Sequence, residues 1–164
     1  MSCSGLGCSL LDRVINQISQ IMEDFRAAFE QRNQDTEALY SSERRVAAMH
    51  FGGIAVECLL KSLILASLPK HAQREWKIGS NAPGHNHTNP GHSFQKALER
   101  NKTLNDRVNR NPKVRNWIKI VESPNQMSFI NMRYSNSIPH EQDYKEWWFA
   151  YTSLRNWLLN HTRK

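Results

Sequence analysis

Apolar residues recur at intervals of three and four along most of the chain, whereas strict alternation of apolar and polar residues is nearly absent. Three-and-four spacing places the apolar side chains on one face of an α-helix. No Asn-Gly or Asp-Gly pair, a common sign of a β-hairpin, occurs in the sequence. The pattern therefore predicts an all-α protein, a bundle of about five helices.

The predicted helices are separated by polar stretches that contain Pro, Asn or Ser. They cover residues 9–32, residues 37–68, a short helix from 92 or 93, residues 112–122 and residues 140–160, and a short apolar segment spans 126–134. Pro69 marks the end of the second helix, because proline cannot continue helical hydrogen bonding. Pro112 suits the first turn of the fourth helix. Glu141 and Asp143 favour the start of the last helix, because acidic groups stabilise a helix N-terminus.

The second predicted helix is apolar on most sides from Val46 onward, which is typical of a central, buried helix. One polar stripe interrupts it, because His50, Glu57 and Lys61 are spaced so that they share a face. Glu57 and Lys61 can form an ion pair within the helix, and His50 can be a core histidine with a satisfied hydrogen bond. Alternatively, the three side chains line a pocket or a groove between subunits. The sequence leaves both interpretations open.

We expect a single domain over residues 1–164, since no repeat or change of composition divides the chain. Residues 1–8, rich in Ser and Gly, are expected to be mobile. Residues 69–91, rich in Pro, Gly, Asn and His, are expected to form a long irregular loop.

Three features predict a cytoplasmic protein that does not cross a membrane. The three cysteines, Cys3, Cys8 and Cys58, do not suggest a disulfide framework. The N-terminus lacks the basic and apolar regions of a secretory signal. The longest apolar stretch, residues 54–68, is interrupted by Glu57 and Lys61, which argues against a membrane span.

The chain carries a net charge of +7, from 22 Lys and Arg residues against 15 Asp and Glu residues. Seven basic residues and a single acidic residue lie between positions 100 and 119. Clustered positive charge binds phosphates through Coulomb attraction and counterion release. The cluster therefore favours docking of a nucleic acid backbone, with an exposed solvated face as the alternative. The expected docking residues are Arg107, Arg110, Lys113, Arg115 and Lys119.

Three histidines, His85, His87 and His92, lie in or next to the predicted loop. An H-x-H pair with a third histidine can bind zinc, but no Cys, Asp or Glu accompanies the three residues between 80 and 92. We favour a polar loop, and we expect neither a metal ion nor a cofactor. Zinc binding would require the three side chains to converge within about 4 Å, because zinc–nitrogen bonds are near 2 Å.

The stretch RYSNSIPH, residues 133–140, lies just before the last predicted helix. Arginine is a permanently charged phosphate ligand, and histidine exchanges protons near neutral pH. Brought together by the turn, Arg133 and His140 could cleave RNA without a metal ion, the arginine stabilising the transition-state charge and the histidine moving a proton. The alternative is a polar turn that joins two helices.

Three segments together resemble the HEPN (higher eukaryotes and prokaryotes nucleotide-binding) domain family. The first is AAMHFGGIAVECLLKSLIL, residues 47–65, similar to the family's long helix, in which a His precedes small residues and an A-x-E-x-x-x-K pattern. The second is GHSFQKAL, residues 91–98, similar to the family's G-H-D-L motif with Ser93 and Phe94 in the last two positions. The third is RYSNS before an aromatic-rich final helix. The three occur in the family's order and cover most of residues 40–160.

The resemblance implies a helical bundle that forms a homodimer and, as in many members, a metal-independent ribonuclease of a toxin–antitoxin or phage-defence system. The family motif is an Arg, four to six residues, then a His, which Arg133 and His140 match at the upper limit. In this interpretation Asn136 orients the scissile group, the basic cluster docks RNA, and a nucleotidyltransferase-type antitoxin is a partner. The alternative is a non-catalytic module that binds a nucleotide or a protein, because other members lack the catalytic His.

Overall fold

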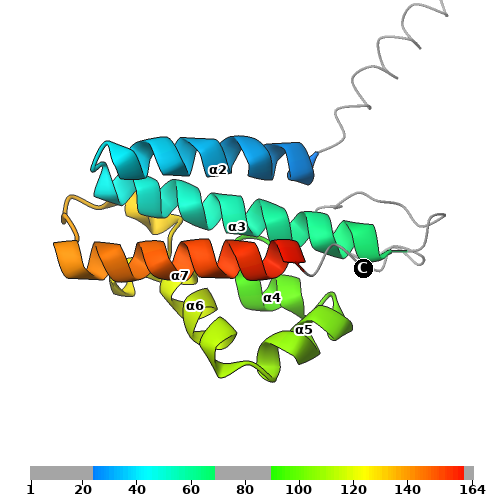
Figure 1. The fold of residues 1–164 in the computed structure, drawn as a ribbon. Helices are drawn as coiled ribbons and strands as arrows, with labels where there is room; N and C mark the ends of the chain where they lie inside the picture. Colours follow the sequence, from blue (N-terminus) through cyan, green and yellow to red (C-terminus); the bar gives the residue numbers. More distant parts are fainter. Residues whose placement is uncertain (1–23, 69–89, 161–164) are drawn as a thin grey trace, which may run out of the picture.

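The computed structural model describes residues 24–68 and 90–160, and within these ranges all regular structure is helical (Figure 1). The prediction of an all-α bundle is therefore confirmed. The α-helices are α2 (Phe25–Ser41), α3 (Arg45–Ser67), α4 (Phe94–Leu98), α5 (Lys102–Asn109), α6 (Pro112–Glu122) and α7 (Glu141–Asn160). Two 3₁₀ helices, η1 (Pro124–Gln126) and η2 (Asn131–Tyr134), lie between α6 and α7.

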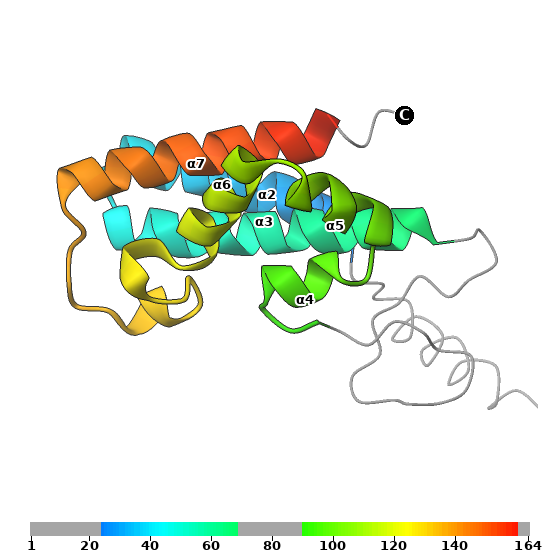
Figure 2. The same cartoon turned by 90° about the horizontal axis from the view of Figure 1, so that it is seen from below.

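The three long helices α2, α3 and α7 lie side by side (Figure 1). Tyr40 of α2 stacks on Trp148 of α7 with ring centroids 3.8 Å apart, and the hydroxyl of Tyr151 donates to Asn33 Oδ1 at 2.8 Å. The shorter helices α4, α5 and α6 lie against one side of this layer, α4 on α3 and α6 on α7 (Figure 2). Buried side chains from all these helices form one hydrophobic cluster.

Helix α3 is the centre of that cluster, as its sequence predicts. Thirteen of its 23 residues are buried, so it presents apolar side chains to α2, α4, α6 and α7. It is long and apolar enough to span a membrane by composition alone, but 72% of its most apolar window is buried inside the molecule, as in a core helix.

Two glycines allow close packing on α3. A Cβ atom on Gly52 would lie 2.6 Å from the ring of Trp147, and one on Gly53 would lie 2.2 Å from the ring of Phe129. Real Cβ atoms do not approach neighbours so closely, and the rings of Trp147 and Phe129 are themselves almost fully buried. The absence of side chains at these two positions therefore sets the distance between α3 and its neighbours.

The boundaries of the first two predicted helices are wrong. Asp24 accepts hydrogen bonds from the N–H groups of Arg26 and Ala27 as the N-cap of α2, so a helix over 9–32 is not continuous, and residues 9–23 lie outside the described part. The helix then continues past residue 32 to Ser41. The predicted helix over 37–68 is interrupted by a turn at 42–44, and α3 begins only at Arg45.

The turn between α2 and α3 has no glycine or proline to signal it. Glu43 has a φ of 56°, the left-handed conformation that glycine usually adopts after a helix. The N–H of Arg44 donates to the carbonyl of Leu39, and the N–H of Glu43 donates to that of Tyr40. This pair of bonds is the Schellman motif, which ends a helix by its geometry even when the left-handed residue is not glycine.

The later part of the chain agrees better with the sequence. Helices α6 and α7 have the predicted bounds to within one residue, and Pro112 occupies the first turn of α6. Helix α5 was not predicted, although Asn101 caps it by accepting from the N–H of Leu104 at 3.0 Å. The segment 126–134 contains η2 and the end of η1. The predictions for residues 1–8 and for most of the loop 69–91 lie outside the described residues.

Candidate phosphate-binding site

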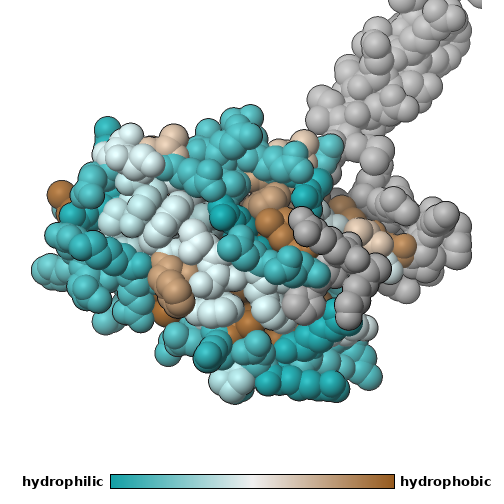
Figure 3. Space-filling model, in the orientation of Figure 1, coloured by the Kyte–Doolittle hydropathy of each residue, from teal (hydrophilic) through white to brown (hydrophobic). Residues whose placement is uncertain are grey.

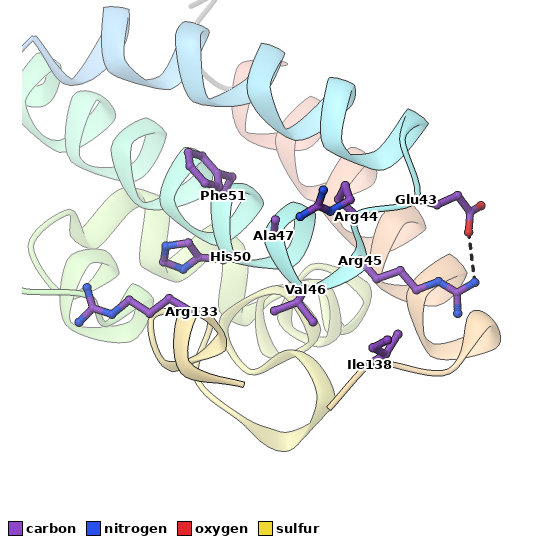
Figure 4. Close-up of a pocket in the computed structure, with 9 residues that line it drawn as sticks. All are labelled: Glu43, Arg44, Arg45, Val46, Ala47, His50, Phe51, Arg133 and Ile138. Atoms are coloured by element: carbon purple, nitrogen blue, oxygen red, sulfur yellow. Dashed lines mark hydrogen bonds and ion pairs between the residues drawn. The ribbon is translucent and has the colours of Figure 1, made fainter. Parts of the chain in front are cut away.

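An open hollow of about 550 Å³ lies beside the turn between α2 and α3 (Figure 4). Its volume is in the range of small-molecule sites. The turn, the first two turns of α3, η2 and the segment before α7 supply its lining. The lining residues are Glu43, Arg44, Arg45, Val46, Ala47, His50, Phe51, Arg133 and Ile138.

Positive charge dominates this hollow, because three arginines and a single carboxylate line it. Glu43 is paired with Arg45 at 3.2 Å, and Arg45 also donates to the carbonyl of Pro139 at 3.1 Å. Neither Arg44 nor Arg133 has a carboxylate partner within residues 24–68 and 90–160. Planar guanidinium groups without a counter-ion favour an oxyanion such as a phosphate, because two of its oxygens can accept a pair of N–H bonds.

Backbone donors add to this positive potential. Val46 and Ala47 lie in the first turn of α3, where helical N–H groups have no partner within the helix. Arg44 at the N-cap provides no side-chain hydrogen bond to them, and neither N–H bonds to another described residue. Both residues line the hollow, so the positive end of the α3 dipole adds to the electrostatic potential there.

His50 lies on the same side of the hollow as Arg133 (Figure 4). Its Nδ1 lies 2.8 Å from the carbonyl oxygen of Phe129, and because a carbonyl only accepts, Nδ1 must carry the proton. Nε2 is then the nitrogen left to accept a proton. The guanidinium of Arg133 lies 4.7 Å from the ring centroid of Tyr134, a cation–π contact that does not use its N–H groups.

The remaining members of the predicted catalytic set lie outside the lining. Asn136 and His140 are exposed, and neither lines the hollow, although Ile138 between them does. Because Arg45 holds the carbonyl of Pro139, the backbone next to His140 is fixed at the edge of the hollow. Arg45 also lies 5.6 Å from the ring centroid of Tyr144, and burial raises the pKa of Tyr144 to about 12, so this phenol stays protonated.

The predicted polar stripe of α3 is divided between two places. His50 lines the hollow, whereas Glu57 and Lys61 form a buried ion pair at 2.7 Å, with 9% and 5% of their side chains exposed. The second oxygen of Glu57 binds Nδ1 of His92 at 2.9 Å. Glu57 and Lys61 therefore compensate each other inside the bundle, and they do not line the hollow.

The predicted RNA-docking residues lie on α5, on α6 and in the turn between them. All five, Arg107, Arg110, Lys113, Arg115 and Lys119, are exposed, and none forms an ion pair with another described residue. Figure 3 shows hydrophilic residues covering the edge of the molecule that α5 forms. Trp117 on α6 meets the 63% exposed Phe149 of α7 edge-on, at 6.4 Å between ring centroids.

Sequence reasoning missed Arg44 and Arg45 as site residues. Only the turn before α3 would have placed these two arginines at the start of a helix. Because no glycine marks that turn, the sequence assigned them to the interior of a continuous helix. Among the residues that the structure describes, no group of three His, Cys, Asp or Glu side chains could hold a metal ion. His85 and His87 lie outside those residues, so the predicted lack of a metal site in the loop stays a prediction.

Comparison of the chain with models of protein families, with curated proteins and with solved structures finds no match. The function is therefore inferred from the hollow and from the charges around it.

Proposed function

We propose that this protein binds RNA and cleaves its phosphodiester bonds without a metal ion, as a HEPN-like ribonuclease of a toxin–antitoxin or phage-defence system. One observation carries the proposal: two arginines that have no carboxylate partner among the described residues line a single hollow together with a histidine. Such a set fits a phosphate and the additional negative charge of its transition state. The order of the three HEPN-like segments along the chain supports the same function.

In this proposal the arginines hold phosphates of the RNA and the histidine moves protons. Arg133, whose side chain lies near His50 in Figure 4, binds a non-bridging oxygen of the scissile phosphate, and Arg44, at another part of the lining, binds a neighbouring phosphate of the RNA. His140 transfers a proton to the leaving oxygen, and Asn136 orients the scissile group. The exposed cations of α5 and α6 bind the RNA backbone independently of sequence.

The proposal includes a homodimer, because His140 does not line the hollow of its own chain. A second copy would bring another 133–140 segment to the site. The proposal also includes a cytoplasmic location and inhibition by a nucleotidyltransferase-type antitoxin.

An RNA-degradation assay in the presence of EDTA tests this function. Wild-type protein should cleave RNA, and Arg133→Gln should lower the rate by about 10²- to 10³-fold, the usual loss when one donor to the transition state is removed. His140→Ala should reduce cleavage similarly. Arg26→Gln is a matched control, because Arg26 is an exposed arginine of α2 paired with Glu30. Equal rates for wild type, Arg133→Gln and His140→Ala would contradict the proposal.

The second candidate is a non-catalytic module that binds a nucleotide or a phosphorylated partner. The exposure of His140 outside the lining favours it, because binding requires only the arginines and the positive end of the α3 dipole. In the same assay this module would leave the RNA intact, and in a separate binding measurement it would retain a nucleotide on the protein. Arg133→Gln would then weaken retention, and His140→Ala would leave it unchanged.

A further inference from the structure

We infer that His50 is the group that removes the proton from the attacking hydroxyl of the RNA. This inference rests on the proposed ribonuclease function and names a residue for it. His50 lines the hollow with Arg133, and its Nδ1 is occupied by the carbonyl of Phe129 at 2.8 Å. In the neutral ring the free lone pair is therefore on Nε2, the atom that can accept a proton.

The surroundings of His50 hold this ring in one orientation. The carbonyl that accepts from Nδ1 belongs to Phe129, which is fully buried and packs against Gly53 one turn further along α3. The ring of Phe51 meets the imidazole edge-on at 5.5 Å between centroids. A general base acts best when its tautomer and direction are fixed before the substrate binds.

The other described histidines lack this combination. His140 is exposed, and it does not line the hollow. His92 has its Nδ1 on Glu57 at 2.9 Å, away from the hollow, and its side chain is 61% exposed. Of these three, His50 alone has a fixed tautomer and lies near an arginine, Arg133, that has no carboxylate partner among the described residues.

The reaction follows from these positions. The 2′-hydroxyl of the RNA gives its proton to Nε2 of His50, and the 2′-oxygen forms a bond to phosphorus while Arg133, near His50 in Figure 4, stabilises the added negative charge. The bond from phosphorus to the 5′-oxygen then breaks, and that oxygen takes a proton from His140 of the second copy in the proposed homodimer, because His140 does not line the hollow of its own chain. The products are a 2′,3′-cyclic phosphate and a free 5′-hydroxyl. His50 and His140 return to their starting forms by exchanging protons with water.

The substitution His50→Asn tests the role of Nε2 alone. The side-chain amide of asparagine can still donate to Phe129 from the place of Nδ1, but it has no atom that accepts a proton at the place of Nε2. His92→Asn is the matched control, because it makes the same change at a histidine that also bonds through Nδ1. Thermal unfolding of both variants shows whether they remain folded.

Cleavage and binding are measured separately, with EDTA throughout. His50→Asn should slow cleavage of saturating RNA by about 10²- to 10⁴-fold, the usual contribution of a general base. Its affinity for DNA of the same sequence, which lacks the 2′-hydroxyl, should stay within about threefold of wild type, because the arginines are unchanged. His92→Asn should match wild type in both measurements. A variant with the affinity of wild type and a large loss of rate supports the inference.

Other results overturn it, and they separate it from the proposed function. If wild type cleaves RNA and His50→Asn cleaves equally fast, the inference fails and the ribonuclease proposal stands. If His50→Asn loses DNA affinity as much as RNA cleavage, His50 is a binding residue and not the base. If wild type does not cleave RNA under any tested condition, the ribonuclease proposal fails, and the inference fails with it.

Discussion

Charged and polar side chains have opposite environments in the middle of α3 and at its N-terminal end. In the middle of the helix, Glu57 and Lys61 are buried, and each has a partner of opposite charge at 2.7 Å. At the N-terminal end, His50 lines an open hollow with Arg44 and Arg133, which have no carboxylate partner among the described residues. Helix α3 therefore contains a compensated ion pair in its middle, and at its N-terminal end it borders a group of positive charges that the described residues do not compensate.

This difference distinguishes polar side chains that stabilise the fold from those that remain available to a ligand. A buried ion pair whose members satisfy each other has no remaining affinity for a ligand, and its loss affects folding. Positive groups gathered without a counter-ion do not help folding, because like charges repel. Their arrangement is what the proposed binding of a phosphate requires.

The largest expected effect on stability comes from breaking the buried ion pair of Glu57 and Lys61. Glu57→Leu should lower the free energy of unfolding by about 3–5 kcal/mol, because it leaves the ammonium of Lys61 buried and unpaired. Urea unfolding followed by circular dichroism measures it. The double variant Glu57→Leu/Lys61→Met should lose far less, because the stranded charge is also removed. A small loss for the single variant would mean that Lys61 reaches solvent.

A second effect concerns the buried hydroxyl of Tyr151. Burial raises the pKa of Tyr151 to about 12 from its ordinary value of about 10. The unfolded chain therefore releases this proton at a lower pH than the folded chain, and the folded state loses up to about 3 kcal/mol as pH rises from about 10 to about 12. Tyr151→Phe should reduce this alkaline decline in unfolding experiments at several pH values. An unchanged decline would assign it to other groups.

Gly53→Ala should affect both the packing of α3 and the candidate site, because its Cβ would lie 2.2 Å from the ring of Phe129. We expect a loss of about 1–3 kcal/mol in unfolding free energy from overpacking. RNA cleavage should also fall, because a displaced Phe129 carbonyl releases His50. Gly91→Ala is the control: nothing lies within 4 Å of its Cβ, and its cost of about 1 kcal/mol comes from a φ of 66° alone. Normal RNA cleavage by a destabilised Gly53→Ala variant would show that the packing of Phe129 does not affect the candidate site.

The smallest effect is expected on the surface of α5 and α6. Lys113→Gln and Arg115→Gln should each weaken RNA binding only a few-fold, and each should reduce the slope of log affinity against log salt by about 1. Fluorescence anisotropy at several salt concentrations measures this slope. The loss should be the same for unrelated RNA sequences, and a sequence-dependent loss would indicate base recognition by these side chains.

The sequence predicts those elements whose signals are local. Helices α6 and α7 have proline or acidic residues at their starts and a clear apolar stripe, so their bounds follow from the pattern. The turn before α3 is set by the left-handed Glu43 and by hydrogen bonds back to Leu39 and Tyr40, which no residue type announces. Helix α5 is only eight residues long, too short for its spacing to be distinctive.

The candidate site is less predictable than the fold. Arg133 was identified from its own motif, but its neighbour His50 comes from another helix and was assigned to a stripe with Glu57 and Lys61. Only the packing of η2 on α3 brings His50 and Arg133 to one hollow. Sequence spacing gives the face of a helix, but it cannot say which distant segment covers each part of that face.

Glu43 affects both the backbone conformation of the turn and the electrostatic potential of the hollow. A left-handed backbone disfavours any side chain with a Cβ, so glycine at this position would relax the turn by about 1 kcal/mol. The same change would remove the sole acidic side chain of the lining and release Arg45 from its ion pair. A more stable hairpin between α2 and α3 would thus come with a stronger, less selective attraction for polyanions.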